Sequence, residues 1–300
     1  MMTDAVYGTP PADLAEVPGD AVQLSPMRPG SSAIETLRDA SLASIVVAAP
    51  PGAVERRFVL VHALRALAPG GRIVALAPKD KGGGRLNGEL TAFGCSVAEH
   101  FKARQRICEA ERPPALADID AAIAEGAPRR IETLGLWSQP GIFSFDRIDP
   151  GSALLIEHLS KLKGQGADLG AGLGVLSAAV LAQPAVASLA LVEIDRRAVE
   201  ASRRNVTDGR AAFHWLDARQ TTLTGLDFVV TNPPFHAEGS EDRGLGQDFI
   251  RASARMLAKG GTLLLVANRH LPYEAALREA FRSTETIAEA GGYKIFEAHR

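Results

Sequence analysis

Short apolar runs alternate with helical patterns along the C-terminal half of the chain. The runs have the length and the aliphatic, β-branched composition of buried strands, and Gly, Pro and Asp punctuate the connections. The predicted strands are Ala167–Leu169, Leu189–Ile194, Ala211–Leu216, Phe228–Thr231 and Thr262–Ala267, and the predicted helices are Val175–Ala182, Arg197–Asn205 and Gln247–Leu257. This alternation predicts an α/β fold with a doubly wound, mostly parallel sheet.

The N-terminal half shows part of the same pattern. Its predicted elements are a strand Ser44–Ala48, a helix Val54–Leu67, a strand Arg72–Ala77 and a Gly-rich basic loop Lys79–Arg85. The Ala-rich segment Leu116–Arg130, with Pro and Gly at its flanks, is the predicted linker. We therefore expect two domains, residues 1–125 and 126–300.

The two halves resemble each other in sequence. The segment Ser44–Gly52 (SIVVAAPPG) parallels Asp227–Phe235 (DFVVTNPPF), and in both halves a helix, a Gly-Gly pair and a strand follow. Ala49 stands where the second copy has Asn232, and Gly52 stands where it has Phe235. The pattern indicates an internal duplication whose first copy has lost its chemistry.

Composition and charge narrow the class of protein. The chain has 300 residues, of which 46% are hydrophobic and 23% charged, and its net charge is −2. Two cysteines and an N-terminus without an apolar core predict a cytoplasmic protein rather than a disulfide-stabilised secreted one. The uncharged stretch Gly170–Val192 is long enough to span a membrane, but its glycines, prolines and polar residues favour buried α/β elements. The near-neutral charge disfavours strong nonspecific nucleic-acid binding, although a local patch could still meet a structured RNA.

A Gly-x-Gly-x-Gly sequence, Asp168-Leu169-Gly170-Ala171-Gly172-Leu173-Gly174, follows the first strand of the C-terminal half. Glycines at such a turn let the backbone approach a ligand and let the next helix pack on the strand. Asp168 at the strand end can meet a cationic ligand group. Gly174 follows Gly172 by two positions, so the loop differs from the usual dinucleotide-binding spacing.

Acids end the next two predicted strands. At the position of Glu193 a carboxylate can accept hydrogen bonds from both hydroxyls of a ribose, and Asp195 is placed to cap the following helix. Asp217 ends the third strand and could accept a hydrogen bond from an adenine amino group. Taken alone, Glu193 and Asp217 could each be an ordinary solvated acid.

The tetrapeptide Asn232-Pro233-Pro234-Phe235 follows the fourth strand and predicts the chemistry. An exocyclic amino group on a base or a carboxamide has a delocalised lone pair, so it must be activated before it can attack a methyl sulfonium. The oxygen of Asn232 and the carbonyl of Pro233 can accept its N–H bonds, and the prolines hold these acceptors in place. Phe235 can stack on a planar substrate.

These residues resemble the class I S-adenosylmethionine-dependent methyltransferases, and more narrowly the bacterial rRNA guanine-N2 methyltransferases of the RsmC and RlmG type. The narrower likeness rests on Asn232–Phe235 and on the segments Pro140–Ser144, Asp149–Ser152, Ala198–Arg203 and Val266–Tyr273. It runs from about Gly141 to the C-terminus. The resemblance implies a Rossmann-like catalytic domain preceded by a degenerate methyltransferase-like N-terminal domain.

The resemblance implies S-adenosyl-L-methionine as methyl donor and N2 of a guanine in ribosomal RNA, with the small subunit favoured, as acceptor. The expected cofactor-binding residues are Asp168, Gly170, Gly172, Gly174, Glu193, Asp217 and Asn232, the expected catalytic residues are Asn232, Pro233 and Phe235, and the expected substrate-binding residues are Pro234, Phe235 and His236. The expected partner is ribosomal RNA or a ribosomal subunit. We expect no metal, no membrane association and a monomer.

Other interpretations remain open at this point. The same tetrapeptide could serve a protein glutamine or a DNA adenine amino group, and a noncatalytic ribosome-associated nucleotide-binding module is a third possibility. An intact Asn232–Phe235 argues against a pure binder, which needs no converging acceptors. His236 and His270 are candidate bases, although structural hydrogen bonding is the simpler role for each.

Overall fold

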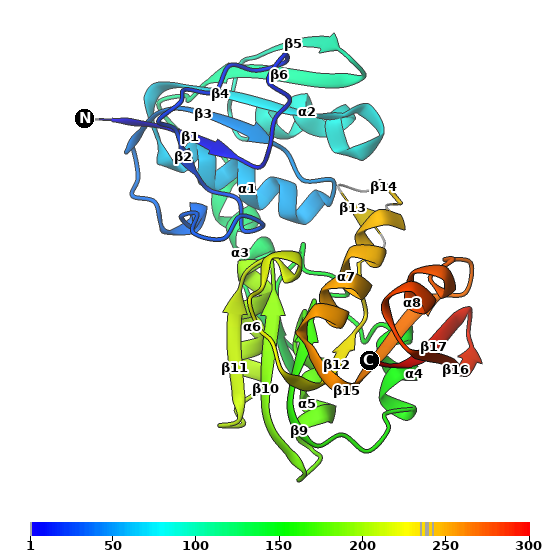
Figure 1. The fold of residues 1–300 in the computed structure, drawn as a ribbon. Coiled ribbons are helices and arrows are strands. Elements are labelled where there is room, and N and C mark those ends of the chain that lie inside the picture. Colours follow the sequence, from blue (N-terminus) through cyan, green and yellow to red (C-terminus); the bar gives the residue numbers. More distant parts are fainter. Residues whose placement is uncertain (1, 235, 238–239, 242) are drawn as a thin grey trace. The chain divides into compact units, whose positions relative to one another are not determined.

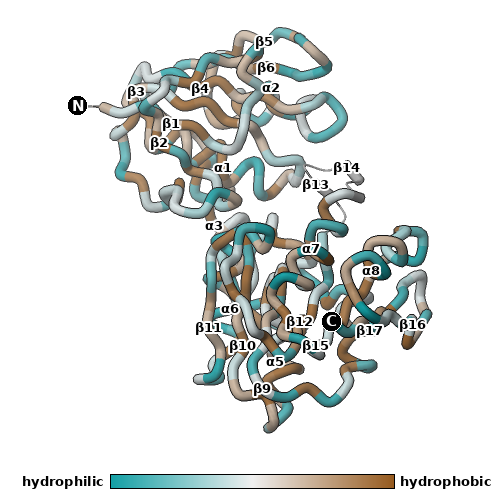
Figure 2. Tube along the Cα trace, in the orientation of Figure 1, coloured by the Kyte–Doolittle hydropathy of each residue, from teal (hydrophilic) through white to brown (hydrophobic). Residues whose placement is uncertain are grey.

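The computed structural model describes residues 2–234, 236–237, 240–241 and 243–300, and the chain divides into two compact units (Figure 1). Unit 1 comprises Met1–Pro128 and Gln139–Gly141, and unit 2 comprises Arg129–Ser138 and Ile142–Arg300. In each unit, hydrophobic residues gather along the central strands, as Figure 2 shows.

Unit 2 is built on a seven-stranded sheet in the order β11-β10-β9-β12-β15-β17-β16. Its strands are β9 (Gly164–Leu169), β10 (Val186–Glu193), β11 (Ala211–Trp215), β12 (Leu226–Thr231), β15 (Leu257–Asn268), β16 (Ser283–Ala290) and β17 (Tyr293–His299). The first five run parallel, and β17 pairs antiparallel with both β15 and β16. The predicted doubly wound, mostly parallel sheet is therefore confirmed.

Helices cover both faces of this sheet. The helices are α4 (Pro150–Glu157), α5 (Val175–Leu181), α6 (Arg196–Asn205), α7 (Arg243–Met256) and α8 (Glu274–Ala280), with a short 3-10 turn η3 (Ala218–Gln220). Alternate residues of one strand face opposite helices: Leu263 and Leu265 of β15 pack with α7 and α8, whereas Leu264 and Val266 pack with α4 and α5. The part of β15 from Leu263 to Ala267 is thus buried on both faces, which explains its continuous apolar sequence.

Unit 1 contains a six-stranded sheet in the order β2-β1-β3-β4-β6-β5. Its elements are β1 (Thr3–Tyr7), β2 (Val22–Gln23), η1 (Ile34–Thr36), β3 (Leu42–Ala48), α1 (Ala53–Ala66), β4 (Leu67–Pro78), η2 (Lys79–Gly83), α2 (Gly84–Ala92), β5 (Val97–Lys102), β6 (Gln105–Glu111) and α3 (Ile119–Gly126). The Gly-rich basic segment makes a tight turn that leads into α2, with a non-helical backbone at Lys81 (φ −110°, ψ 44°) and Gly82 (φ 98°, ψ −17°), and its last residues Gly84 and Arg85 already belong to α2.

The order β3-α1-β4-α2-β5-β6 in unit 1 repeats β12-α7-β15-α8-β16-β17 in unit 2. The backbone of Gly70 and Gly71 exchanges hydrogen bonds with Arg112, and Gly260 and Gly261 do the same with Arg300. Gly71 lies where a Cβ would come within 3.0 Å of backbone oxygens, and the same holds for Gly261. These matched contacts support the duplication inferred from the sequence.

The prediction of a linker needs correction. The segment Leu116–Arg130 is not a linker along its length, because residues Ile119–Gly126 form α3 and pack in unit 1. Ala122 is 1% exposed, and Gly126 lies against the ring of Phe58, so this Ala-rich stretch is a packing surface. The hairpin β7 (Arg129–Ile131) and β8 (Leu136–Ser138), which the sequence did not predict, follows in unit 2.

The described residues contain no helix that is both long and apolar enough to cross a membrane, and Gly170–Val192 instead forms a loop, α5 and most of β10. Cys95 and Cys108 are buried free thiols.

Candidate functional site

The predicted site residues of unit 2 lie at one edge of its sheet. Neighbouring parallel strands β10, β9 and β12 end together, with Val192 paired to Leu169 and Leu169 paired to Thr231. The carboxyl ends of these strands therefore bring Glu193, the Gly170–Gly174 loop and Asn232 to the same edge. Ligands in open α/β folds bind at this edge.

The glycine loop adopts backbone conformations that residues other than glycine rarely adopt. Gly170, Gly172 and Gly174 have φ of +72°, +52° and +81°. A Cβ on Gly174 would lie 2.7 Å from a methyl carbon of Val206, so glycine is required for close packing at the start of α5. At Gly172 the space around a Cβ is open, which leaves the backbone accessible to a ligand.

Asp168 is a buried carboxylate beneath this loop. It is 1% exposed and accepts a hydrogen bond of 2.6 Å from the hydroxyl of Ser177. Burial raises the pKa of Asp168 to about 7, and the negative charge of Glu193 adds to the rise, while the Ser177 bond opposes it. A cationic group beside such a carboxyl would favour its ionised form.

Glu193 ties the end of β10 to the glycine loop. Its Oε2 accepts from the Gly172 N–H at 2.8 Å, and its Oε1 accepts from the N–H groups of Ile194 at 2.7 Å and Asp195 at 2.9 Å. Burial raises the pKa of Glu193 above its ordinary value, against the lowering effect of these bonds. The carboxylate is thus preorganised beside the loop.

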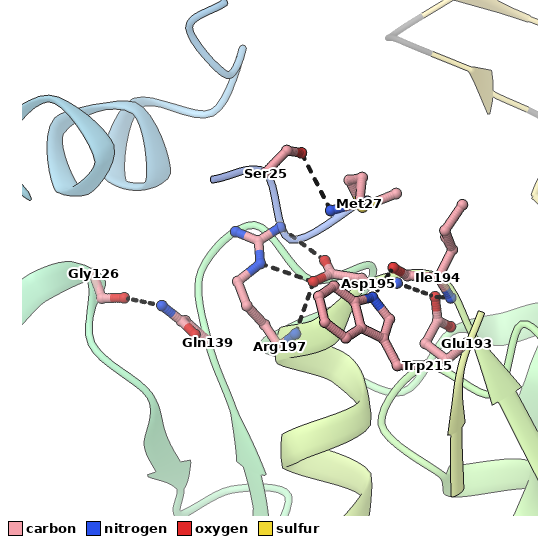
Figure 3. A network of polar contacts seen from close by, with 9 residues as sticks. All are labelled: Ser25, Met27, Gly126, Gln139, Glu193, Ile194, Asp195, Arg197 and Trp215. Carbon is pink, nitrogen blue, oxygen red and sulfur yellow. Dashed lines mark hydrogen bonds and ion pairs between the residues drawn. The ribbon is translucent and has the colours of Figure 1, made fainter. Parts of the chain in front are cut away.

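Asp195 caps α6, as predicted. It accepts from the backbone N–H of Arg197 at 2.9 Å, and its carboxylate pairs with the Arg197 guanidinium at 2.8 Å (Figure 3). The indole N–H of Trp215 donates to the Ile194 carbonyl at 2.8 Å in the same network. These contacts fix the turn that carries Glu193.

Asp217 follows β11 and caps η3. Both of its carboxylate oxygens accept hydrogen bonds from Arg219, at distances from 2.6 to 3.0 Å. Burial raises the pKa of Asp217, but the bonds from Arg219 outweigh burial, so the net shift is downward. An adenine amino group would share this acid with Arg219, a partner that the sequence did not reveal.

Asn232 is held in a defined orientation. Its side-chain nitrogen Nδ2 donates to Oδ2 of Asp149 at 2.8 Å and to Oγ of Ser152 at 2.8 Å. A carboxylate can only accept, so these bonds identify the nitrogen of the amide and leave its oxygen, Oδ1, as the atom that can act on a substrate. Asp149 also caps α4 by accepting from the Ser152 N–H at 2.9 Å.

A pocket lies beside these residues. Its walls are formed by Phe143, Ser144, Arg147, Asp149, Ser152, Asp168, Gly170, Ala171, Gly172, Leu173, Val175, Leu176 and Asn232. Of the predicted cofactor-binding residues, Asp168, Gly170, Gly172 and Asn232 line this pocket, whereas Gly174, Glu193 and Asp217 are not among its lining residues. The sequence had assigned no role to Arg147, Asp149 or Ser152.

The rest of the predicted site is described in part. Pro233 is buried and Pro234 is exposed. Phe235 and the side chain of His236 lie outside the described residues, so their predicted roles are not tested. His270 is exposed just beyond the end of β15. Among the described residues no cluster of three or more His, Cys, Asp or Glu could hold a metal ion.

The matching position of unit 1 has a different arrangement. Arg56, which is 2% exposed, donates to the carbonyls of Pro50 and Pro51 at 3.2 and 2.8 Å and forms a bidentate pair with Glu89. The guanidinium of Arg56 therefore already binds the loop carbonyls that could accept hydrogen bonds from a substrate. Ala49, at the position of Asn232, has no side-chain amide.

The sequence of this chain is similar to those of known methyltransferases. The methyltransferase small domain family matches residues 133–297. The chain is 34% identical to "Ribosomal RNA small subunit methyltransferase C" of Pseudomonas paraeruginosa, over 97% of this chain and 92% of the relative, and 32% identical to the protein of that name from Pseudomonas aeruginosa strain LESB58, with the same coverage.

A solved structure is similar over the whole chain. It is described as "T. Thermophilus 16S rRNA N2 G1207 methyltransferase (RsmC) in complex with AdoMet and Guanosine". The TM-score is 0.80 and the identity 26%, over 100% of this chain and 88% of that one. The chain therefore belongs to the methyltransferase small domain family and, within it, to the family of ribosomal RNA small subunit methyltransferase C.

Proposed function

We propose that this chain transfers a methyl group from S-adenosylmethionine to N2 of a guanine in the 16S ribosomal RNA of the small subunit, in the cytoplasm. The name of the similar T. thermophilus enzyme gives G1207 of 16S rRNA as its target. We propose the guanine at the corresponding position as the target of this chain. Family membership supports the reaction class, and the oriented amide of Asn232 is the observation that carries the chemistry.

Acidic residues of the pocket and of the neighbouring strand ends support a cofactor site at this edge of the sheet. We assign the buried carboxylate of Asp168, which accepts a hydrogen bond from Ser177, to the α-ammonium group, and Glu193, which contacts the glycine loop, to the ribose hydroxyls. Asp217 is proposed for the adenine amino group. The bound cofactor supplies an electrophilic methyl group on its sulfonium.

The protein then has to make guanine N2 a nucleophile. Its lone pair is delocalised into the ring, and acceptors for the two N–H bonds favour a nitrogen with a localised lone pair. We assign these acceptors to Oδ1 of Asn232 and the carbonyl of Pro233, with Pro234, Phe235 and His236 contacting the base. Asp149 and Ser152 position the Asn232 amide. Alignment of nitrogen, methyl carbon and sulfur supplies much of the remaining effect. The alkylated nitrogen is acidic and loses one of its two protons to water, which needs no strong base.

Cofactor affinity should depend on pH through Asp168. The pKa of this carboxyl is raised to about 7 in the ligand-free protein, whereas an ammonium group binds the ionised form. Below pH 7 a proton must leave on binding, so affinity for S-adenosylhomocysteine should rise from pH 6 to 7.5 and be about tenfold weaker at pH 6 than at its plateau. Calorimetry in two buffers of different ionisation enthalpy would count the released proton. If the Asp168→Asn variant kept the wild-type dependence of affinity on pH, the released proton would have to come from another group.

Removal of the Ser152 hydroxyl should weaken catalysis through Asn232. Ser152→Ala deletes one of the two acceptors of the amide N–H groups while the cap of α4, made by the Ser152 backbone, remains. We expect turnover to fall about threefold to tenfold, the effect of about one hydrogen bond, with cofactor affinity unchanged. In the Asn232→Ala background the same substitution should cost nothing more, because its target is gone. If Ser152→Ala lowered turnover by the same factor in the Asn232→Ala background as in the wild type, Ser152 would have to act independently of Asn232.

Modification mapping tests the proposed substrate. In ribosomal RNA from a strain that lacks the gene, mass spectrometry should find one guanine of 16S rRNA without its N2-methyl group, and plasmid expression should restore it. An unchanged modification map, together with a missing methyl group on a protein glutamine or a DNA adenine, would favour the corresponding alternative.

A further inference from the structure

The pocket contains a positive charge that the proposed reaction does not use. Among the residues that line it, all of which the structure describes, Arg147 is the one that carries a positive charge. Asp149 and Asp168 also line the pocket, and Glu193 contacts its glycine loop. The lining therefore carries two carboxylates and one guanidinium.

Arg147 lies on a tight turn. Its backbone N–H donates to the Ser144 carbonyl at 3.3 Å, and Ser144 has a φ of +50°. The side chain is 71% exposed and pairs with its sequence neighbour Asp146 at 3.2 Å, whose own side chain is 47% exposed. An exposed pair of this kind contributes little to stability, so the guanidinium can exchange it for a ligand at small cost.

The amino-acid end of the cofactor would be stabilised by a guanidinium in addition to the acids. Its amino-acid end carries an ammonium and a carboxylate, and the acids Asp168 and Asp149 can stabilise the first but repel the second. A guanidinium binds a carboxylate through two parallel hydrogen bonds. We infer that Arg147 binds the carboxylate of the amino-acid end of the cofactor, opposite the Asp168 subsite for its ammonium; this inference rests on the proposed function.

Two ligands separate this role from a general effect on the pocket. S-Adenosylhomocysteine has the amino-acid carboxylate, whereas 5′-methylthioadenosine has the same nucleoside without it. In calorimetric titrations of the full chain, Arg147→Ala should weaken S-adenosylhomocysteine binding by about 10- to 100-fold, the effect of a lost charge-assisted pair. Binding of 5′-methylthioadenosine should change by less than about twofold, which also shows that the variant is folded.

Matched variants complete the test. Arg147→Lys keeps the positive charge but cannot form the two parallel hydrogen bonds of a guanidinium, so it should bind S-adenosylhomocysteine more tightly than Arg147→Ala and less tightly than wild type. If the Ala variant does not fold, Arg147→Gln allows the same comparison of the two ligands. Arg251→Ala on α7 removes another half-exposed arginine with an acidic neighbour and should leave both affinities unchanged.

The outcomes distinguish the inference from the proposed function. Wild-type affinity of Arg147→Ala for S-adenosylhomocysteine, or an equal loss for both ligands, would overturn the assignment of Arg147 and leave the proposed function intact. A wild-type chain that binds neither ligand would overturn the proposed function and the inference together.

Discussion

Replacement of Asn232 by Ala should lower the rate of methyl transfer by about a hundredfold or more while S-adenosylhomocysteine affinity stays within about threefold of wild type. The reason is that Oδ1 acts on the amino group of the substrate mainly as the nitrogen attacks, when its lone pair must be localised. Single-turnover rates with 16S rRNA substrate, together with calorimetry, would measure both effects.

Asn232→Asp is the informative companion variant. It keeps an oxygen acceptor of the same size, but a carboxylate cannot donate to Asp149, which accepts from the amide at 2.8 Å in the native protein. The two negative charges should repel, so this variant should also be slow although an acceptor remains. Asn232→Ala with wild-type turnover would show that the amino group is activated by other residues.

Glu193→Ala should abolish most of the cofactor affinity, with a loss of about 100-fold or more. It removes the acceptor proposed for two ribose hydroxyls, and hydrogen bonds to a charged group contribute about 1.5–3 kcal/mol each. The variant also leaves the N–H groups of Gly172, Ile194 and Asp195 without their acceptor, so the glycine loop should be less ordered. Calorimetry and amide hydrogen exchange of the loop measure the two consequences.

Glu200→Ala is a matched control for this prediction. Glu200 lies on α6 with its side chain 55% exposed and pairs with Arg196, so its removal deletes an acid of the same type whose partner is not in the glycine loop. Both cofactor affinity and loop exchange should be unchanged. If Glu193→Ala bound S-adenosylhomocysteine like this control, the ribose subsite would have to be placed elsewhere.

In unit 2 the sequence predicted the five parallel strands of the sheet but not its antiparallel pair. The central strands β9, β10, β12 and β15 carry runs of buried residues, so their apolar sequences stand out, whereas the edge strand β11 is only half-buried. The antiparallel pair β16 and β17 was not predicted, because β16 (STETIAEA) is largely exposed or half-buried and has no clean alternation. In unit 1 the strand β1, only five residues long, was missed for lack of a distinct apolar run.

The linker prediction failed for a related reason. Leu116–Arg130 looked like a connector because Ala, Gly and Pro are common in connectors. Small side chains are also what a helix needs to approach a neighbour closely, and α3 does this with Ala122 and with Gly126 against Phe58. Composition alone does not separate these two uses of small residues.

At the site, sequence reasoning named the residues at strand ends but not the residues that hold them. Asp168, Glu193 and Asn232 follow from motif position. The contact of Asn232 with Asp149 joins residues 83 positions apart, and no local pattern predicts it. Asp149 did carry a signal, since Asp before Pro150 is typical of a helix start, and that signal indicates a cap but not its second role. The pairing of Asp217 with Arg219 depends on side-chain conformation and was equally hidden.

The most direct test of the account is the identity of the methylated atom. Purified chain, methyl-labelled S-adenosylmethionine and small subunits or 16S rRNA from a strain lacking the gene would be incubated together, and the RNA digested to nucleosides. The account predicts that the label elutes with N2-methylguanosine and that Asn232→Ala reduces it by about a hundredfold. Label in any other nucleoside, or label in ribosomal protein with none in RNA, would contradict it.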